Sequence, residues 1–162
     1  EAQRSFGDKA AYEKNMKLAV AKLKAAVKDR PNNTVAAVKL AQMLDQQNNT
    51  EEAIRVLYPM LEGKSAITEG ADLRLLLGDM LSKKGEKDKA LEQYKLASEV
   101  ALKSDLSTHQ QLLAKFQQLN KPDLVAAEQA WIADYNKRME EMRAMQEKNA
   151  PKPSRTAPKP GG

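Results

Sequence analysis

Residues 75–97 read LLLGDMLSKKGEKDKALEQYKLA, a stretch of helix-forming Leu, Lys and Glu that contains Gly78 and Gly85. A glycine inside a helix costs about 0.5–1 kcal/mol relative to alanine, so two glycines so close together need a physical reason. We interpret Gly78 as a contact residue, small enough for a neighbouring helix to approach. We interpret Gly85 as the end of one helix, before Glu86 and Asp88 open the next. The stretch is therefore predicted to be a hairpin of two helices.

The same pattern recurs along the chain. Residues 38–61, VKLAQMLDQQNNTEEAIRVLYPML, align with the hairpin at a separation of 37 residues. The alignment pairs Leu77 with Leu40, Gly78 with Ala41, Gly85 with Asn48, Ala90 with Ala53 and Tyr94 with Leu57. Upstream, Ala19 precedes Ala53 by 34 residues. Downstream, LLAKFQQLNKPDLVAAEQAW (112–131) is a degenerate copy that we align with Ala114 in the small position.

A period of 34 residues with this pattern resembles the tetratricopeptide repeat family. The copy at 71–102 resembles it best and departs from it at Arg74, where a Trp is common, and at Leu81, in place of Tyr. The resemblance covers roughly residues 10–135. It implies an all-α fold, a short α-solenoid of antiparallel helix pairs that stack because each pair alone has too little core. Its matching residues are Leu77, Gly78, Gly85, Ala90, Tyr94 and Ala97.

The composition agrees with an all-α fold and gives little support to catalysis. Aromatic residues make up only 4% and there is no cysteine, which excludes disulfides, thiolate catalysis and Cys-based metal sites. The single histidine, His109, has no second histidine or nucleophile pattern beside it, so we expect a surface or helix-cap residue. Acidic pairs such as Glu51–Glu52 and Glu140–Glu141 are expected on solvated helix faces. We therefore predict neither enzyme activity nor a cofactor or metal.

The resemblance also implies where a partner would bind. In the family, the first helix of each pair lines a concave groove that is suited to a peptide or a helix. The matched positions in this sequence are Val38, Gln42 and Asp45 from one repeat, Leu75, Asp79 and Ser82 from the next, and Gln111 and Lys115 from the last.

The last helix is predicted to be unusually long. Residues 123–148 would extend about 39 Å at 1.5 Å per residue, about twice a repeat helix. Its second half presents Met139, Met142 and Met145 on one side. Methionine-rich helix faces adapt to varied partners, so this side is a second candidate binding surface. The alternative is that the second half folds back over the solenoid.

Three segments are expected along the chain. Residues 1–135 form the repeat domain, residues 136–148 extend the last helix, and residues 149–162 form a flexible tail rich in Pro and Lys. The tail carries Lys152, Arg155 and Lys159 and no acid. The whole chain has a net charge of +5. Without these three residues, 24 basic residues remain against 22 acidic ones, a net charge of +2. Such a body is not strongly cationic, so we do not expect nucleic acid as a partner.

Two function classes follow. The first is a non-catalytic adaptor or scaffold subunit that binds a protein or peptide within a larger homo- or hetero-oligomeric assembly. The second is a module for polyanions or membrane surfaces that makes peripheral contact through the tail and the Lys14, Lys17, Lys24 and Lys28 stripe. The start without Met and the Pro/Lys tail favour a processed bacterial envelope or periplasmic protein, and a cytoplasmic location stays the alternative.

Overall fold

A computed structural model describes residues 2–61, 66–101 and 105–149, and this part of the chain is built from helices. The all-α prediction is confirmed, and the long last helix is close to its predicted bounds. In chain order the helices are α1 (Ala2–Asp29), α2 (Thr34–Gln46), α3 (Thr50–Leu61), α4 (Ala66–Lys83), α5 (Lys87–Val100), α6 (Leu106–Gln118) and α7 (Pro122–Asn149).

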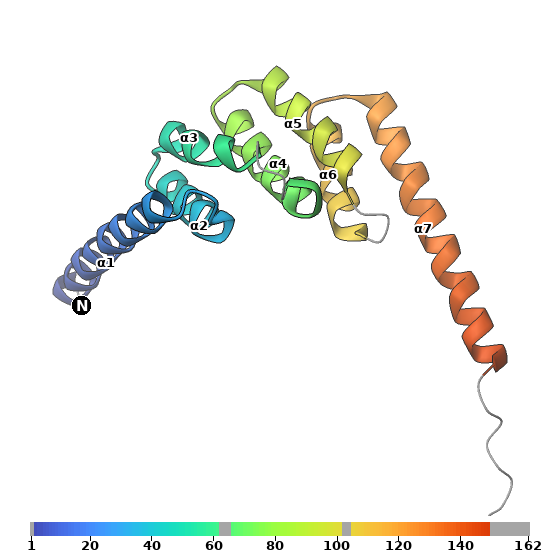
Figure 1. Ribbon diagram of the computed structural model, residues 1–162, viewed down its shortest axis with the longest axis horizontal. Helices are drawn as coiled ribbons and strands as arrows, with labels where there is room; N and C mark the ends of the chain where they lie inside the picture. Colours follow the sequence, from blue (N-terminus) through green and yellow to red (C-terminus); the bar gives the residue numbers. More distant parts are fainter. Residues whose placement is uncertain (1, 62–65, 102–104, 150–162) are drawn as a thin grey trace, which may run out of the picture.

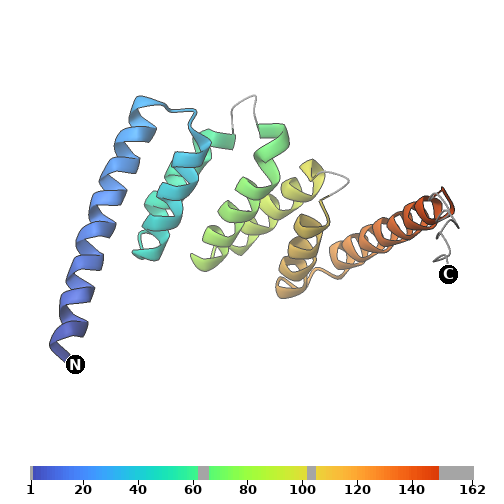
Figure 2. The same ribbon diagram turned by 90° about the horizontal axis from the view of Figure 1, so that it is seen from below.

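The helices form an arch of stacked antiparallel pairs, α2–α3, α4–α5 and α6–α7, with α1 ahead of them (Figure 1). The first helices α2, α4 and α6 lie along the inner side of the arch, and α3 and α5 lie along the outer side. Successive helices pack against each other from α1 to α7, and α4 also contacts α6. Figure 2 shows α1 and α7 at the two ends of the row.

Each hairpin turn contains one residue in the left-handed region of backbone conformation. These residues are Asn48 (φ 60°), Gly85 (φ 86°) and Asn120 (φ 51°). Glycine and asparagine tolerate this region best, which explains why the sequence uses them to end α2, α4 and α6. The interpretation of Gly85 as a helix end is confirmed. Equivalent backbone bonds close the three turns: Asn49 N–H donates to Leu44 C=O, Glu86 to Leu81 and Lys121 to Phe116, at 2.9, 2.9 and 3.0 Å.

The core repeats with the same spacing as the turns. The positions that bury side chains in α2 recur 37 residues later in α4 and a further 35 residues later in α6. The equivalent sets are Ala36, Leu73 and Thr108; Leu40, Leu77 and Leu112; and Leu44, Leu81 and Phe116. The alignment on Ala114 is therefore wrong by one residue. Ala114 is exposed, and half-buried Leu113 takes the position of Ala41 and Gly78.

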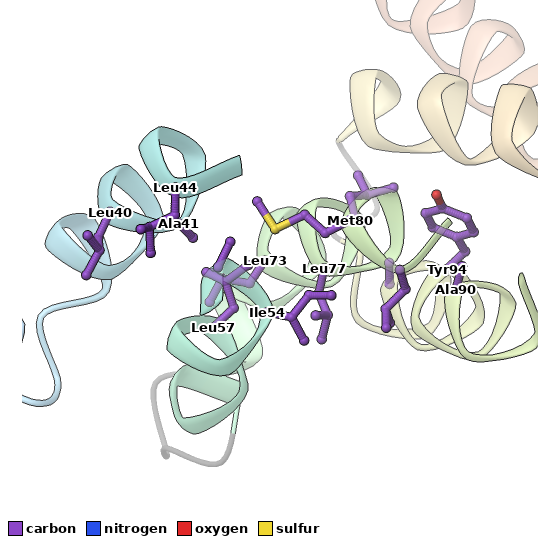
Figure 3. Packing of buried hydrophobic residues seen from close by; sticks show 14 of the residues in the cluster. Leu40, Ala41, Leu44, Ile54, Leu57, Leu73, Leu77, Met80, Ala90 and Tyr94 are labelled. Atoms are coloured by element: carbon purple, nitrogen blue, oxygen red, sulfur yellow. The ribbon is translucent and has the colours of Figure 1, made fainter. Parts of the chain in front are cut away.

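Gly78 is a contact residue, as its place in the sequence predicts. A Cβ added there would lie 2.4 Å from Cε1 and 2.8 Å from Cδ1 of Tyr94, which is too close for a side chain. The buried Tyr94 ring therefore lies directly over the backbone of α4, within the apolar cluster of Figure 3. In the preceding pair the equivalent residues are Ala41 and Leu57. Ala41 is larger than Gly78, and Leu57 is smaller than Tyr94. Both combinations fill the space between two closely packed helices.

Candidate functional site

The inner side of the arch is hollowed between α2 and α4. The hollow has a volume of about 390 Å³. We call it the α2–α4 groove, and its lining residues are Thr34, Val35, Val38, Lys39, Gln42, Asp72, Leu73 and Leu76. Of the predicted groove residues, Val38 and Gln42 lie in this lining. Val35 is 64% exposed beside them, so the groove presents an apolar surface to solvent.

The structure corrects the α4 side of the predicted groove. Leu75 is only 5% exposed and belongs to the core, so its side chain does not line the groove. Leu76 and Asp72 lie there instead. The error is one residue, and one residue turns a side chain by about 100° around a helix, enough to exchange groove for core. Ser82 on α4 is half-buried and Gln111 on α6 is exposed, and neither lines the groove.

The other three predicted groove residues bind the repeats to each other. Asp45 of α2 lies 2.9 Å from the amine of Lys83 in α4. Asp79 of α4 lies 2.7 Å from the amine of Lys115 in α6. We call these contacts the inter-repeat ion pairs. Each joins the first helix of one pair to the first helix of the next, so Asp79 and Lys115 meet as neighbours.

Hydrogen bonds hold both carboxylates in place. The Thr50 hydroxyl donates to Asp45 at 2.5 Å, and the Tyr94 hydroxyl donates to Asp79 at 2.7 Å. Burial works to raise the pKa of Asp45, but the hydrogen bonds from Thr50 and Lys83 and the Lys83 charge outweigh it, and the pKa lies below its ordinary value. Burial and the bond to Asp79 raise the pKa of the Tyr94 hydroxyl, which therefore stays a donor. The carboxylates of Asp45 and Asp79 therefore already have partners within the protein.

The methionine face of α7 stays open to solvent. Met139 is half-buried beside Leu106 and Tyr135, while Met142 and Met145 are 49% and 63% exposed. Because α7 runs as one helix to Asn149, the alternative in which its second half folds back over the solenoid is wrong (Figure 1). The predicted tail residues Lys152, Arg155 and Lys159 lie outside the described residues.

His109 is buried, and the expectation of a surface or helix-cap residue is wrong. Its Nδ1 lies 2.6 Å from Oε2 of Glu128 in α7, and the Ser98 hydroxyl of α5 donates to Oε1 of the same carboxylate at 2.6 Å. The imidazole stacks on the Trp131 ring at 3.5 Å. Both members of the pair are less than 5% exposed. This buried polar contact joins α5, α6 and α7, and it places the imidazole inside the protein.

A fixed spacing in the sequence could have revealed this pair. Arg74 Nη1 donates to Gln93 Oε1 at 3.1 Å, from the first helix of a pair to the second, across 19 residues. His109 and Glu128 are also 19 residues apart, and so are Ala37 and Val56 in the first complete pair. We call these equivalent places the pairing positions. The first pairing position lies on the first helix of a pair, and the second lies on the second helix.

The comparisons with known proteins agree with this geometry. The model of the tetratricopeptide repeat family matches residues 13–98, more than half of the chain. The chain belongs to the tetratricopeptide repeat family. A search of proteins with curated functional descriptions finds no match to it.

Solved structures of tetratricopeptide-like fold are also similar to this chain. A structure titled "MamA RS-1 ArsTM double mutant" is 19% identical with a TM-score of 0.61, covering 80% of this chain and 70% of its own. MamA from residue 41 of Desulfovibrio magneticus RS-1 is 18% identical with a TM-score of 0.58, over 78% and 70%. A structure titled "Crystal structure of MamA protein" is 16% identical with a TM-score of 0.54, over 94% of both chains. At these identities the likeness concerns the fold.

In chemical terms the tetratricopeptide repeats offer binding surfaces. Within residues 9–61, 70–101 and 105–149, whose side chains are described, no group of three His, Asp or Glu side chains is placed to hold a metal ion. None of the described helices is both long and apolar enough to cross a membrane. Among the described residues, the exposed surfaces include the α2–α4 groove, the far half of α7 and part of α1.

Proposed function

We propose that this chain is a non-catalytic adaptor or scaffold subunit that binds a peptide or helix of a partner protein in the α2–α4 groove. The observation that carries the proposal is the open hollow with Val38 and Leu76 on its walls and Leu73 at its base. Apolar side chains of a partner would gain by leaving water there, at roughly 25 cal/mol per Å² of buried apolar area.

The polar rim would orient the partner. Lys39 and Asp72 flank the hollow, and neither belongs to an ion pair within the described part of the chain. The inter-repeat ion pairs occupy Asp45 and Asp79, so within the described groove lining Lys39 and Asp72 are available to a ligand. Charges at a rim fix orientation and partner choice more than affinity. A short amphipathic segment with one acid and one base fits these features.

A second candidate function rests on α1. Lys14, Lys17 and Lys28 are exposed and form no ion pair within the described residues, whereas Lys24 lies 2.7 Å from Glu52. An anionic surface, whether a polyanion or a lipid bilayer, could use this stripe. Such binding would weaken steeply with salt, and binding to an apolar groove would not.

Paired variants test the groove. Leu76→Glu places a charge in the groove wall, and Tyr58→Glu also introduces a charge in place of an exposed large hydrophobic residue, on α3 and outside the groove. Both variants are compared with the parent by affinity capture from the source cell extract at two salt concentrations. We expect Leu76→Glu to lose a specific set of proteins that Tyr58→Glu retains, with both variants folded by circular dichroism. Identical sets for both variants would contradict the groove, and a salt-sensitive set shared by the parent and both variants would favour α1.

A further inference from the structure

Helix α1 has the sequence of the second helix of a pair, yet no first helix covers it within the described part of the chain. Ala19 and Leu23 align with Ala53 and Leu57 of α3, and both residues of α3 are fully buried. On α1 the equivalent side chains are only half-buried. The difference arises because α3 lies between α2 and α4, whereas α1 packs against α2 and adds only one ion pair to α3 (Figure 2).

The molecule itself shows what covers such a face. In the pairs α2–α3 and α4–α5, the side of the second helix that α1 leaves open is occupied by the first helix of the same pair. The turn that would return the chain for such a pairing is absent from α1, which runs as one helix from Ala2 to Asp29. Residues 15–29 of α1 therefore offer an exposed face on which one more helix could pack. We call this face the seat.

Lys22 specifies the chemistry of that helix. It precedes Val56 by the same 34 residues that separate Ala19 from Ala53, so it takes the second pairing position. In the three complete pairs this position is held by Val56, whose equivalent first-helix residue by spacing is Ala37, by Gln93 bound by Arg74, and by Glu128 bound by His109. Lys22 is exposed and forms no ion pair within the described residues. A helix that covered Lys22 would need a carboxylate opposite it, because a buried unpaired amine is costly.

We propose that α1 is a docking surface for an amphipathic helix of a partner protein, packed on Ala19 and Leu23 and carrying an Asp or Glu opposite Lys22. The site is distinct from the α2–α4 groove and does not depend on it. The exposed lysines Lys14 and Lys28 add positive charge to the same helix, which would attract an acidic helix.

A second copy of this chain does not fit the seat. Its first helices would bring Ala37, Arg74 or His109 to the first pairing position. Arg74 would oppose Lys22 with like charge, and Ala37 and His109 supply no carboxylate. The chemistry therefore argues against a second copy of this chain as the occupant.

The probe is a synthetic peptide of residues 70–84, the first-helix sequence of α4, with Arg74→Glu so that a carboxylate faces Lys22. The matched peptide keeps Arg74. Binding to the full chain is measured by fluorescence anisotropy, and the site is mapped by amide chemical-shift changes. We expect the acidic peptide to bind roughly tenfold more tightly than the basic one, with shifts at Ala19, Lys22 and Leu23.

Charge reversal in the protein provides the control. Lys22→Glu should reverse the preference, so that the peptide with Arg74 becomes the tighter ligand, while Lys17→Glu on another side of α1 should leave the order unchanged. Absence of saturable binding, an affinity independent of the charge at residue 22, or shifts confined to Val38 and Leu76 would overturn the proposal. So would a self-association that Lys22→Glu abolishes, or spin labels at residues 3 and 22 that lie close together in the free chain.

Discussion

The contact between Gly78 and Tyr94 sets the distance between α4 and α5. Gly78→Ala places a methyl group 2.4 Å from the Tyr94 ring, which is buried and has little room to move. We expect the free energy of unfolding to fall by about 1–3 kcal/mol, although alanine favours a helix more than glycine does. Urea unfolding followed by circular dichroism measures the change.

The chain supplies the second variant for a double-mutant cycle, because the equivalent pair is Ala41 and Leu57. In a Tyr94→Leu background, Gly78→Ala should cost less than about 0.5 kcal/mol or should stabilise the fold. Equal costs in the two backgrounds would mean that Gly78 is not held small by the tyrosine ring.

For the buried pair of His109 and Glu128, removing one partner should lower the free energy of unfolding more than replacing both partners by apolar residues. Glu128→Met alone leaves the imidazole Nδ1 without its partner, and we expect a loss of about 3 kcal/mol. The double variant His109→Leu with Glu128→Met keeps similar volumes and should lose less than the single variant does. Trp131, the one tryptophan of the chain, stacks on His109 and reports unfolding of this region by its fluorescence. A double variant less stable than the single one would contradict this account.

Between elements, the Asp45–Lys83 pair joins α2 to α4 and makes stability depend on pH. The pKa of Asp45 is lower in the folded chain than its ordinary value of 3.8, so the ionised group stabilises the fold at neutral pH. This contribution is lost as the pH falls below that value. At pH 7, Asp45→Asn should lower the free energy of unfolding by about 0.5–1 kcal/mol, since the pair is partly exposed.

The comparison with the parent chain should be made by urea unfolding at several pH values. The difference between the two chains should shrink as the pH falls below 3.8, because Asp45 then becomes protonated and the ion pair is lost. Asp72→Asn removes the same charge from a residue with no such ion pair and should show little difference at any of these pH values. A difference that does not shrink as the pH falls would place the effect in the side-chain shape and not in the charge.

The sequence predicts the elements better than it predicts which side of each helix faces the groove. Gly85 and Asn48 identified two turns because few residue types adopt a left-handed backbone. The α6 copy is spaced 35 residues from its predecessor, and the small residue Ala114 drew the alignment one position away from Leu113. That shift concealed the position of His109. The correct alignment of Leu75 with Val38, 37 residues earlier, predicts a groove position for Leu75, yet it is buried and Leu76 lines the groove. Side-chain direction changes by about 100° per residue, so both the alignment and the rotation of each helix must be correct to the residue.

Across the whole molecule, the inter-repeat ion pairs lie along the inner side of the arch and should limit how far it opens. Lys83→Met together with Lys115→Met removes both pairs and keeps the aliphatic stems. We expect the radius of gyration from small-angle X-ray scattering to increase while the helix content stays constant. About 1 M salt should open the parent chain in the same direction, because screening then acts over roughly 3 Å. Lys95→Met on α5 is the control and should leave the radius unchanged.

The pairing positions also bear on how the chain finds its native partners during folding. Neighbouring repeats of similar sequence can exchange helices, and such misassembly is a known hazard of repeat proteins. Here one geometric position has three chemistries: alanine with valine, arginine with glutamine, and histidine with glutamate. If α4 paired with α3, the Arg74 guanidinium would face Val56 without an acceptor. If α2 paired with α7, the Glu128 carboxylate would face Ala37 without a donor. Each of these two exchanges leaves a polar group unsatisfied, so the pairing positions disfavour exchange between the apolar pair α2–α3 and either of the polar pairs.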